Sequence, residues 1–427
     1  MRILYVSPHF PPDISALSAR VHDLTTRWVA SGHEVHVLCG MPCHPTGVLP
    51  PAYKRKIAVN EGVDGVQVHR RWVYATPNSG TKRRSLSYAS FAASTVASAA
   101  TLPDVDVVIS TSPQFLSGMA GSLLAYIKRL PLIVEIRDLW PLSITEMGMM
   151  DTESSTVKRL EALEEMLYKS ADTLVVVSEP FRQHIADRTP GTEVDDIAVI
   201  TNGVDVERFH PDNDGQALRD QLGVTGTLAI YAGTHGLAMG LTTVVEAARL
   251  VPEVTVAFIG EGAAKADVMM AAKGVPNVHF LPGQQREAMP AIYAAADACL
   301  VPLRDLDVFQ TVIPSKMFEI WASGKPVILG VRGHAAAMTK ASGGGIVVTP
   351  EDPAELAAAL RTLAADPKAA TAMGLSGRAH VMTDYNRDVL ADRYLELMAD
   401  TIRTADTSRR PRSWSLVRRV VQALATA

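Results

Sequence analysis

A lysine and a glutamate three residues apart, Lys316 and Glu319, are the side chains whose types and spacing point most directly to chemistry. They follow Pro314 and Ser315, so the sequence predicts a proline stop, Ser315 as the N-cap and a helix that begins at Lys316. Residues three apart share a helix face, and a helix N-terminus attracts phosphate. Lys316 could therefore hold a diphosphate while Glu319 accepts the hydroxyls of a ribose. The alternative is a surface ion pair worth about 0.3 kcal/mol.

Two glycine-bounded turns follow expected strands earlier in the same half of the chain. The first contains Gly233, Thr234, His235 and Gly236, and the second contains Gly260, Glu261 and Gly262. Glycines in such turns let backbone N–H groups approach an anion closely. Plain turns between strand and helix are the alternative for each, but two turns at the same end of one sheet favour a binding site.

Polar and charged residues also follow two expected strands in the first half. His9 and Asp13 lie in a proline-rich loop, which lacks the glycine fingerprint of a dinucleotide site. Glu135, Arg137 and Asp138 cluster at the end of an apolar run. Charges at the carboxyl end of a buried parallel strand favour a site, whereas an ion pair among them is the structural alternative.

These residues need elements to position them, and short apolar runs alternate with helical patterns along nearly the whole chain. In the first half, strands are expected at Arg2–Val6, Glu34–Leu38, Val66–Arg71, Val105–Ser110, Leu132–Ile136, Thr173–Val177 and Ile197–Ile200. In the second half, they are expected at Leu228–Ala232, Val254–Ile259, Val278–Phe280, Ala298–Val301, Val327–Gly330 and Ile346–Val348. The fold class is therefore α/β, with two doubly wound parallel-sheet domains of the Rossmann-like kind that face a cleft.

The polar segment Asn202–Gln216 is read as the hinge between the two domains. The expected division is an N-terminal domain over 1–205, a C-terminal domain over 206–385, a helix over 386–404 that packs back on the first domain, and a tail over 405–427. Met41–Ser85 is expected to be a long loop, either a solvated excursion or a basic lip over an anionic acceptor or a membrane surface.

Composition excludes several classes of protein. The chain has 427 residues, of which 47% are hydrophobic and 20% charged, and its net charge of −4 argues against nucleic-acid binding. The three cysteines, Cys39, Cys43 and Cys299, provide neither a zinc pattern nor a disulfide framework, and so favour a reducing cytoplasm. We expect no signal peptide and no membrane-spanning helix.

With these loops in place, residues 1–402 resemble the family 4 retaining glycosyltransferases, which have the GT-B fold. The resemblance is greatest to the bacterial branch that makes exopolysaccharide, capsule and O-antigen, around the L-fucosamine transferases. It is carried by the segments Phe10–Pro12, Gly32–Val35, Pro45–Gly47, Arg137–Pro141, Asn202–Asp205, Tyr231–Gly233, Gly260–Gly262, Pro314–Lys316 with Phe318–Glu319, and Gly324–Val327.

The resemblance implies a UDP-linked sugar donor on the C-terminal domain and a glycan or lipid-linked acceptor on the N-terminal one. Donor contacts would come from Gly233, Thr234, His235, Gly236, Gly260, Glu261, Gly262, Leu281, Pro282, Gly283, Pro314, Ser315, Lys316 and Glu319. The transferred sugar and acceptor would meet His9, Phe10, Pro12, Asp13, Arg137 and Asp138, and Asp138, Lys316 and Glu319 would be catalytic. Transfer would keep the anomeric configuration and need neither metal nor cofactor, with the leaving diphosphate taking the acceptor proton.

Four positions depart from the family pattern. Thr311 replaces a glutamate eight residues before Glu319, Met239 replaces a basic residue, His334 replaces a glutamate and Leu142 also stands where a glutamate is common. These changes leave two other functions open, a non-hydrolysing UDP-sugar epimerase and a catalytically silent sugar-nucleotide-binding subunit. The epimerase needs paired acid–base residues, and no second carboxylate is evident beside Glu319.

The tail beyond the resemblance has its own pattern. Over residues 408–424, Trp414, Val417, Val421 and Leu424 share a helical face while Arg418 and Arg419 lie off it. This pattern is typical of a basic interfacial helix, and would place the protein at the inner face of the cytoplasmic membrane. A helix packed on the first domain and a disordered tail are the alternatives.

Overall fold

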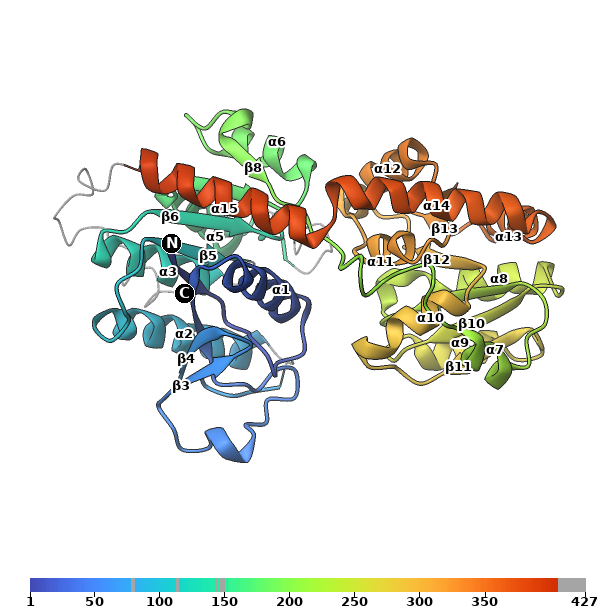
Figure 1. Cartoon of the computed structure of the whole chain (residues 1–427), viewed down its shortest axis with the longest axis horizontal. Helices are drawn as coiled ribbons and strands as arrows, with labels where there is room; N and C mark the ends of the chain where they lie inside the picture. The colour runs from blue at the N-terminus through green and yellow to red at the C-terminus, as the bar shows by residue number, and fades with distance from the viewer. Residues whose placement is uncertain (78–80, 113–114, 143–144, 146–149, 152, 406–427) are drawn as a thin grey trace. The chain divides into compact units, whose positions relative to one another are not determined.

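The computed structural model describes residues 1–77, 81–112, 115–142, 145, 150–151 and 153–405. The chain divides into two compact units (Figure 1). Of the described residues, the N-terminal unit contains those in 1–201 and 391–405, and the C-terminal unit contains 202–390. These limits lie within a few residues of the boundaries expected at 205 and 385. The amphipathic helix predicted over 408–424 lies outside the described residues.

The N-terminal unit is built on an eight-stranded sheet with the order β3-β4-β2-β1-β5-β6-β7-β8. Its strands are β1 (Arg2–Val6), β2 (Glu34–Gly40), β3 (Ala58–Val63), β4 (Val66–Arg71), β5 (Val107–Thr111), β6 (Leu132–Ile136), β7 (Thr173–Val176) and β8 (Ile197–Val199). All neighbours pair in parallel except β3 and β4. Its helices are α1 (Ala16–Ala30), α2 (Thr81–Ala97), α3 (Phe115–Lys128), α5 (Ser155–Ser170), α6 (Glu179–Arg188) and α15 (Arg387–Thr404).

The C-terminal unit has a six-stranded sheet with the order β11-β10-β9-β12-β13-β14, in which every pair is parallel. Its strands are β9 (Leu228–Ala232), β10 (Thr255–Ile259), β11 (Val278–Leu281), β12 (Ala298–Pro302), β13 (Val327–Gly330) and β14 (Gly345–Val347). Its helices are α7 (Gln216–Leu222), α8 (Leu241–Leu250), α9 (Lys265–Ala271), α10 (Met289–Ala295), α11 (Lys316–Ala322), α12 (His334–Ser342), α13 (Pro353–Ala365) and α14 (Pro367–Asp384). The two parallel-sheet α/β units agree with the fold class predicted from the sequence.

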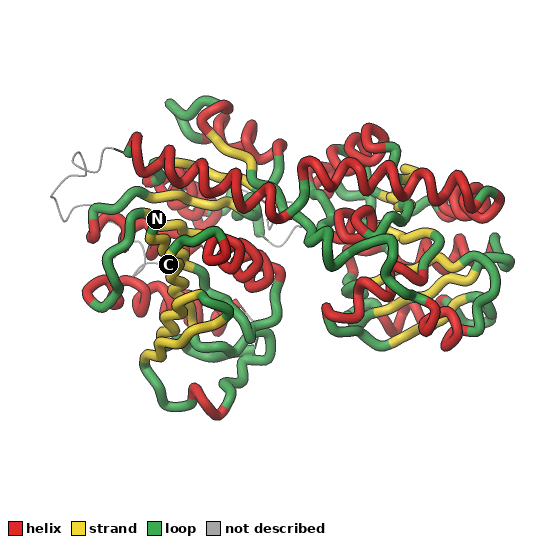
Figure 2. The backbone as a smooth tube through the Cα atoms, in the orientation of Figure 1, coloured by secondary structure: helices red, strands yellow, loops and turns green. Residues whose placement is uncertain are grey.

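Strands lie at the centre of each unit with helices around them (Figure 2). The central strands β5, β6 and β9 are buried along their whole length. Continuous burial requires cover on both faces of the sheet, which explains why these strands are apolar runs rather than alternating patterns. Within the described residues, no helix is both long and apolar enough to cross a bilayer.

The last helix, α15, packs on the N-terminal unit from residue 391 onward. The indole N–H of Trp28 donates to the carbonyl of Ala391 at 3.1 Å, and the rings of Trp28 and Tyr394 meet at 5.3 Å. Further along α15, the hydroxyls of Thr173 and Thr401 are 2.7 Å apart. Both aromatic rings are fully buried, so the helix is part of the core of this unit.

The strand predicted at Val66–Arg71 is confirmed as β4, but the expectation that the rest of Met41–Ser85 is a long loop is wrong. The segment contains a short 3-10 helix at Pro51–Tyr53 and the antiparallel pair β3 and β4. Strand β3 was not predicted because it is an edge strand with an exposed, polar pattern, so it lacks the apolar periodicity of a core strand.

Candidate functional site

The C-terminal sheet has a topological switch point at β9. Strand β9 pairs with β10 on one side and with β12 on the other. Loops that leave the carboxyl ends of such strands diverge in opposite directions, and in open parallel sheets ligands bind in the space between them. The loop after β9 carries Gly233–Gly236, and the chain reaches Lys316 after β12. The predicted residues are therefore gathered at this switch point.

The glycine loops after β9 and β10 approach each other too closely for side chains. The N–H of Gly233 donates to the carbonyl of Ile259 at 2.9 Å. A Cβ on Gly260 would lie 1.9 Å from the carbonyl oxygen of Gly233, and one on Gly262 would lie 2.4 Å from that of His235. Both glycines also have positive φ values, 157° and 158°. Sterics therefore require glycine at 260 and 262.

Lys316 places its ammonium group beside the first glycine loop. Its Nζ donates to the carbonyl of Ala232 at 3.1 Å and lies 4.2 Å from the ring centroid of Tyr231. A Cβ on Gly233 would approach Nζ to 2.8 Å. Burial lowers the pKa of Lys316 to about 8, partly opposed by the charge of Glu319. Among the described residues, no carboxylate lies within 4.0 Å of this ammonium. An anion is the partner that such a cation lacks.

Glu319 lies on the same helix but has different surroundings. It forms no salt bridge with Lys316 within the described residues, so the surface ion pair considered above is not formed. The hydroxyl of Tyr293 lies 3.5 Å from its Oε2. Burial raises the pKa of Glu319, and the charges of Arg387, Arg286 and Arg208 oppose that rise. The Glu319 carboxylate can therefore still accept hydrogen bonds, and it lies in the field of these arginine charges.

The start of α11 differs from the prediction in two respects. Ser315 is exposed and has helical φ and ψ, and its side chain makes no capping hydrogen bond, so the expectation of an N-cap is wrong. The N–H of Met317 donates to Pro314 at 2.9 Å, and that of Phe318 donates to Ser315 at 3.2 Å. Two of the first amide groups are therefore already satisfied by the turn. An anion at the start of α11 would therefore be attracted mainly by the charge of Lys316 rather than by free backbone N–H groups.

The remaining residues that were predicted to contact the sugar donor lie around these loops. The carboxylate of Glu261 accepts from Lys265 at 2.7 Å and from the N–H of Gly283 at 3.3 Å, and Gly260 N–H donates to Leu281 at 3.3 Å. These bonds bring Gly260–Gly262 against Leu281, Pro282 and Gly283. The carbonyl of Thr234 accepts from the hydroxyl of Tyr231 at 2.7 Å, and Gly236 ends the loop.

His235 has a more unusual position in the same loop. Its side chain is fully buried, and neither ring nitrogen has a hydrogen-bond partner. The ring packs against Tyr231 and Phe258, with centroids 5.7 Å and 6.1 Å away. Burial lowers its pKa, as do the charges of Lys265 and Lys316, so the imidazole is neutral at pH 7. The backbone N–H of His235 donates to the carbonyl of Glu261 at 2.9 Å. The clear role of this residue is therefore in the backbone hydrogen bonds of the loop.

The N-terminal sheet has its own switch point at β1, between β2 and β5. In the loop after β1, Nδ1 of His9 lies 3.1 Å from Oδ2 of Asp13. The other oxygen of Asp13 accepts from the N–H groups of Cys43 and His44 at 2.9 and 2.8 Å. Asp13 is buried and joins two loops, so its main role is structural. Pro12 is exposed, whereas Phe10 is fully buried; the expectation that Phe10 faces an acceptor is wrong because the ring has no free surface.

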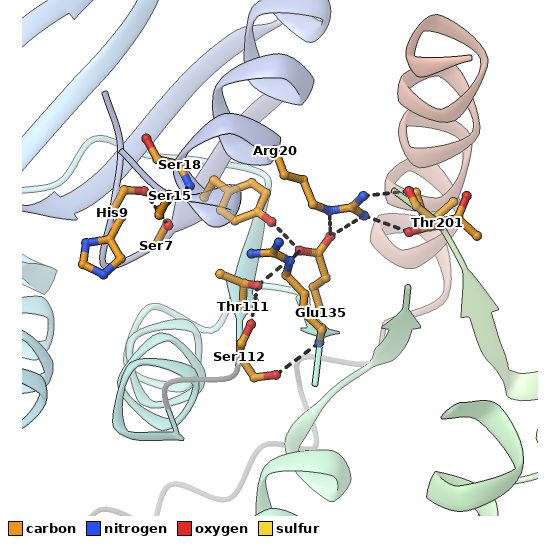
Figure 3. A network of polar contacts seen from close by, with 12 residues as sticks. Ser7, His9, Ser15, Ser18, Arg20, Thr111, Ser112, Glu135 and Thr201 are labelled. Carbon is orange, nitrogen blue, oxygen red and sulfur yellow. Dashed lines mark hydrogen bonds and ion pairs between the residues drawn. The ribbon is translucent and has the colours of Figure 1, made fainter. Parts of the chain in front are cut away.

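A buried carboxylate, Glu135, organises the charges beside this switch point (Figure 3). It accepts from Nε and Nη2 of Arg20 at 3.2 and 2.9 Å, from the hydroxyl of Tyr5 at 2.8 Å and from that of Thr111 at 3.1 Å. Arg20 also donates to the carbonyls at 200 and 201, at 2.8 and 2.7 Å. The pKa of Glu135 lies below its ordinary value because the neighbouring arginine charges and hydrogen bonds outweigh its burial. This network fixes α1, β1, β5, β6 and the end of β8 to one another.

Arg137 and Asp138 follow β6 directly. The Arg137 side chain is 11% exposed, and its Nε lies 4.0 Å from Oε1 of Glu135 without a hydrogen-bond partner. Burial lowers the pKa of Arg137, partly opposed by Glu135. Asp138 is half-buried and interacts electrostatically with Arg137. The structure thus places Arg137 mainly in the Glu135 network, and leaves Asp138 as the more accessible carboxylate after β6.

All four departures from the family pattern fall in local structure that is described, and Leu142 packs against the hydrophobic core of the N-terminal unit. Met239 packs against the hydrophobic cores on both faces of the C-terminal sheet. Thr311 ends a 3-10 helix over Asp307–Thr311, and His334 is the first residue of α12. Within the described part of the chain, no group of three or more His, Cys, Asp and Glu side chains is arranged to hold a metal ion.

Comparisons with known proteins agree with this two-unit division. Residues 15–203 match the glycosyl transferase 4-like domain, and residues 220–366 match the glycosyl transferases group 1. A provisionally named colanic acid biosynthesis glycosyl transferase of Escherichia coli K12 is 26% identical over 344 residues, which is 77% of this chain and 83% of the relative.

Two further similarities are to proteins that are described with a nucleotide sugar. A GDP-mannose-dependent monoacylated α-(1-6)-phosphatidylinositol monomannoside mannosyltransferase of Corynebacterium glutamicum is 32% identical over 216 residues, 47% of this chain and 55% of that protein. The crystal structure of Anabaena Alr3699/HepE in complex with UDP-glucose has a TM-score of 0.67 and 16% identity, and covers 94% of this chain and all of the other. At that identity the structural likeness shows the fold.

Replacing Glu135 by glutamine tests the buried network. The substitution keeps the shape but leaves Arg20 without its counter-charge, so we expect a loss of about 3–5 kcal/mol in the free energy of unfolding at pH 7. The difference from the wild type should shrink as the pH falls through the carboxyl range, because protonation of Glu135 then removes the same charge. The control is Glu153→Gln, whose exposed pair with Lys158 should contribute less than about 1 kcal/mol. Equal unfolding midpoints for the two variants would contradict the assignment.

Replacing Gly260 by alanine tests the close approach of the glycine loops. The new methyl group would collide with the carbonyl of Gly233, so we expect a destabilisation of about 1–3 kcal/mol. Gly226→Ala is the matched control, because its Cβ would have only the carbonyl of Glu253 at 4.0 Å. Chemical unfolding of both variants measures the difference, and a Gly260 variant as stable as the Gly226 variant would refute it.

Proposed function

The chain belongs to the glycosyltransferases with the GT-B fold, and from that premise we propose that it transfers a sugar from a UDP-linked donor, with retention of configuration, to a glycan or lipid-linked acceptor. The C-terminal unit binds the donor and the N-terminal unit binds the acceptor. The work takes place in the cytoplasm, in the biosynthesis of cell-surface polysaccharide. The L-fucosamine transferases are the finer comparison that the sequence motifs suggest for the sugar.

The observation that carries the donor site is the half-buried ammonium of Lys316 at the switch point of the C-terminal sheet. It lies next to Gly233, and no described carboxylate neutralises it. A diphosphate supplies the missing negative charge and accepts the remaining N–H donors of the ammonium. A side chain at residue 233 would collide with this ammonium, so glycine there lets a phosphate approach Lys316 closely.

The nucleoside would extend from the diphosphate towards Glu319 and the loop pairs. The Glu319 carboxylate accepts hydrogen bonds from the ribose hydroxyls, and Gly260–Gly262 with Leu281–Gly283 form the base pocket. The known complex of Alr3699/HepE with UDP-glucose supports a uridine donor. The GDP-mannose-dependent relative makes guanosine the competing base, so the donor test must include both.

Charge stabilisation would account for most of the catalysis. As the glycosidic bond breaks, charge develops on the leaving diphosphate, and a preorganised cation in a buried site stabilises that charge strongly. The diphosphate then takes the proton of the acceptor hydroxyl, so no metal or cofactor is needed. Asp138, at the end of β6, is the carboxylate that contacts the transferred sugar or acceptor.

A panel of nucleotides and nucleotide sugars, scored by thermal shift and then by calorimetry, tests the proposal. A matched donor at about 100 times its Kd should raise the free energy of unfolding by about 2.7 kcal/mol. UDP, GDP, ADP and dTDP should be compared with and without their sugars. Stabilisation by none of them would overturn the donor site, and stabilisation by GDP alone would correct the base. Binding without transfer or donor hydrolysis would indicate a silent subunit, and epimerised donor would indicate an epimerase.

The charge of Lys316 predicts a specific pH dependence of binding. Protonated Lys316 binds the diphosphate, and its pKa in the free protein is about 8, so the Kd for UDP should stay level below pH 7 and rise as the pH passes 8. Lys316→Met should weaken binding by about tenfold or more and flatten this dependence, since a hydrogen bond to a charged group contributes about 1.5–3 kcal/mol. Lys340→Met, at an exposed lysine of α12, is the control. A Kd that is constant from pH 7 to 9.5 in the wild type would contradict the role.

Glu319 predicts a different signature, because it recognises the ribose and not the phosphates. Glu319→Ala should raise the Kd of UDP about tenfold or more, by the loss of hydrogen bonds to a charged acceptor. The Kd of inorganic diphosphate should change little in the same variant. Calorimetry with both ligands measures the contrast, and an unchanged Kd for UDP would remove Glu319 from the site.

A further inference from the structure

The N-terminal unit concentrates exposed apolar side chains in one part of its surface. Fourteen large hydrophobic residues are exposed in the described part of the chain, and six of them lie between residues 14 and 86. They are Ile14, Val48, Ile57, Trp72, Tyr74 and Leu86, with exposed fractions from 36% to 79%. Scattered exposed apolar residues need no explanation, but a group on one surface marks an interaction site.

Backbone contacts join these residues into one surface. Ile57 and Trp72 extend the β3–β4 pairing, and the N–H of Trp72 donates to the carbonyl of Ile57 at 2.8 Å. Side chains alternate along an extended segment, so Trp72 and Tyr74 point outward while Val73, between them, is buried in the core. The N–H of Tyr74 donates to the hydroxyl of Ser90 at 2.8 Å, and Leu86 is one turn before Ser90 on α2.

The other two members adjoin the same surface from the loops after β1 and β2. A Cβ on Gly47, next to Val48, would lie 2.1 Å from the backbone nitrogen of Pro77, just beyond Tyr74. The N–H of Ile14 donates to the carbonyl of His44 at 3.5 Å. The apolar group therefore reaches from the β3–β4 hairpin and α2 to the loop of His9 and Asp13, which the proposed function assigns to the acceptor.

Basic residues border this apolar group at two places. Lys54, Arg55 and Lys56 directly precede Ile57 and are all exposed, and Arg83 and Arg84 are exposed on the first turn of α2 before Leu86. Within the described residues, none of these five has a carboxylate partner within 4.0 Å. Arg84 donates instead to the hydroxyl of Tyr88 at 3.2 Å. The border therefore carries uncompensated positive charge.

We propose that this surface, formed by Ile57, Trp72, Tyr74 and Leu86 with the basic segments 54–56 and 83–84, binds the surface of an anionic lipid bilayer. Trp and Tyr side chains are suited to the interface between headgroups and acyl chains, because each has an apolar ring and a polar tip. The basic side chains meet the anionic headgroups, whose surface potential attracts clustered Lys and Arg. The surplus positive charge distinguishes this partner from a second copy of the chain, which would place like charges against one another across a symmetric contact.

The inference does not depend on which nucleotide the C-terminal unit binds. It rests on the proposed function in one respect only. The surface lies next to the loop of His9 and Asp13, to which the proposed function assigns the acceptor, and both belong to the same unit. A lipid-linked acceptor in a bilayer would then be presented next to that loop, and transfer would not require the lipid to leave the membrane.

Vesicle co-sedimentation of the full chain tests the proposal, with the tail present in every variant. Vesicles of equal parts phosphatidylglycerol and phosphatidylcholine are compared with phosphatidylcholine alone. The wild type should bind the anionic vesicles, and Ile57→Ser with Trp72→Ser should lower the partition coefficient at least tenfold. The matched control, Leu250→Ser with Met270→Ser, removes two exposed apolar residues of the C-terminal unit and should change it less than twofold.

A second pair of variants tests the charge. Neutralising Lys54, Arg55 and Lys56 to glutamine should lower the partition coefficient at least tenfold, since each basic residue near the surface contributes about fivefold. The control neutralises Lys273, Lys340 and Lys368, three exposed lysines of the C-terminal unit. The far-UV circular dichroism spectrum and the unfolding midpoint should match the wild type in all four variants, which shows that both units are folded.

Three results would overturn the proposal. The first is equal binding of the wild type to anionic and neutral vesicles, or none to either. The second is equal binding by the surface variants and their controls, which would assign any membrane affinity to another part of the chain. The third is a sedimentation-velocity shift from dimer to monomer in the surface variants, which would identify a second copy as the occupant.

Discussion

The candidate site depends on one close approach of two backbones, that of Gly233 after β9 and that of Gly260 after β10. The N–H of Gly233 donates to Ile259, and no side chain fits at Gly260 against the carbonyl of Gly233. Because β9 and β10 are parallel neighbours, both loops leave the same edge of the sheet. Their contact fixes the backbone beside which Lys316 lies, and the position of Lys316 in turn gives the site its positive charge.

Each unit has a charged side chain near the switch point of its sheet, but the two charges have different surroundings. In the N-terminal unit, Glu135 is neutralised by Arg20 and surrounded by hydrogen bonds, so a buried charge stabilises the junction of several elements. In the C-terminal unit, Lys316 is half-buried, with one carbonyl partner and no described carboxylate. A satisfied buried charge serves structure, whereas an unsatisfied one implies a ligand. This contrast is why the proposed donor site is placed at Lys316 and not at the more highly charged end of β6.

Much of this was predictable from the sequence, because the physical causes are local. Apolar runs predicted the buried parallel strands, and glycine pairs predicted the loops at Gly233 and Gly260. Long-range contacts were not predictable. The burial of Phe10 depends on neighbours distant in sequence, and the edge strand β3 has too few apolar residues to show a period. The lack of a cap at Ser315 follows from a tight turn that its residue type does not reveal.

Hydrogen–deuterium exchange of the full chain, with and without saturating UDP, tests the central claim most directly. The account predicts slower exchange in the segments 232–236, 259–262, 281–283 and 314–319, and little change over 7–13 and 135–138. Protection confined to the N-terminal unit, or UDP binding that leaves the four loops of the C-terminal unit unchanged, would contradict it.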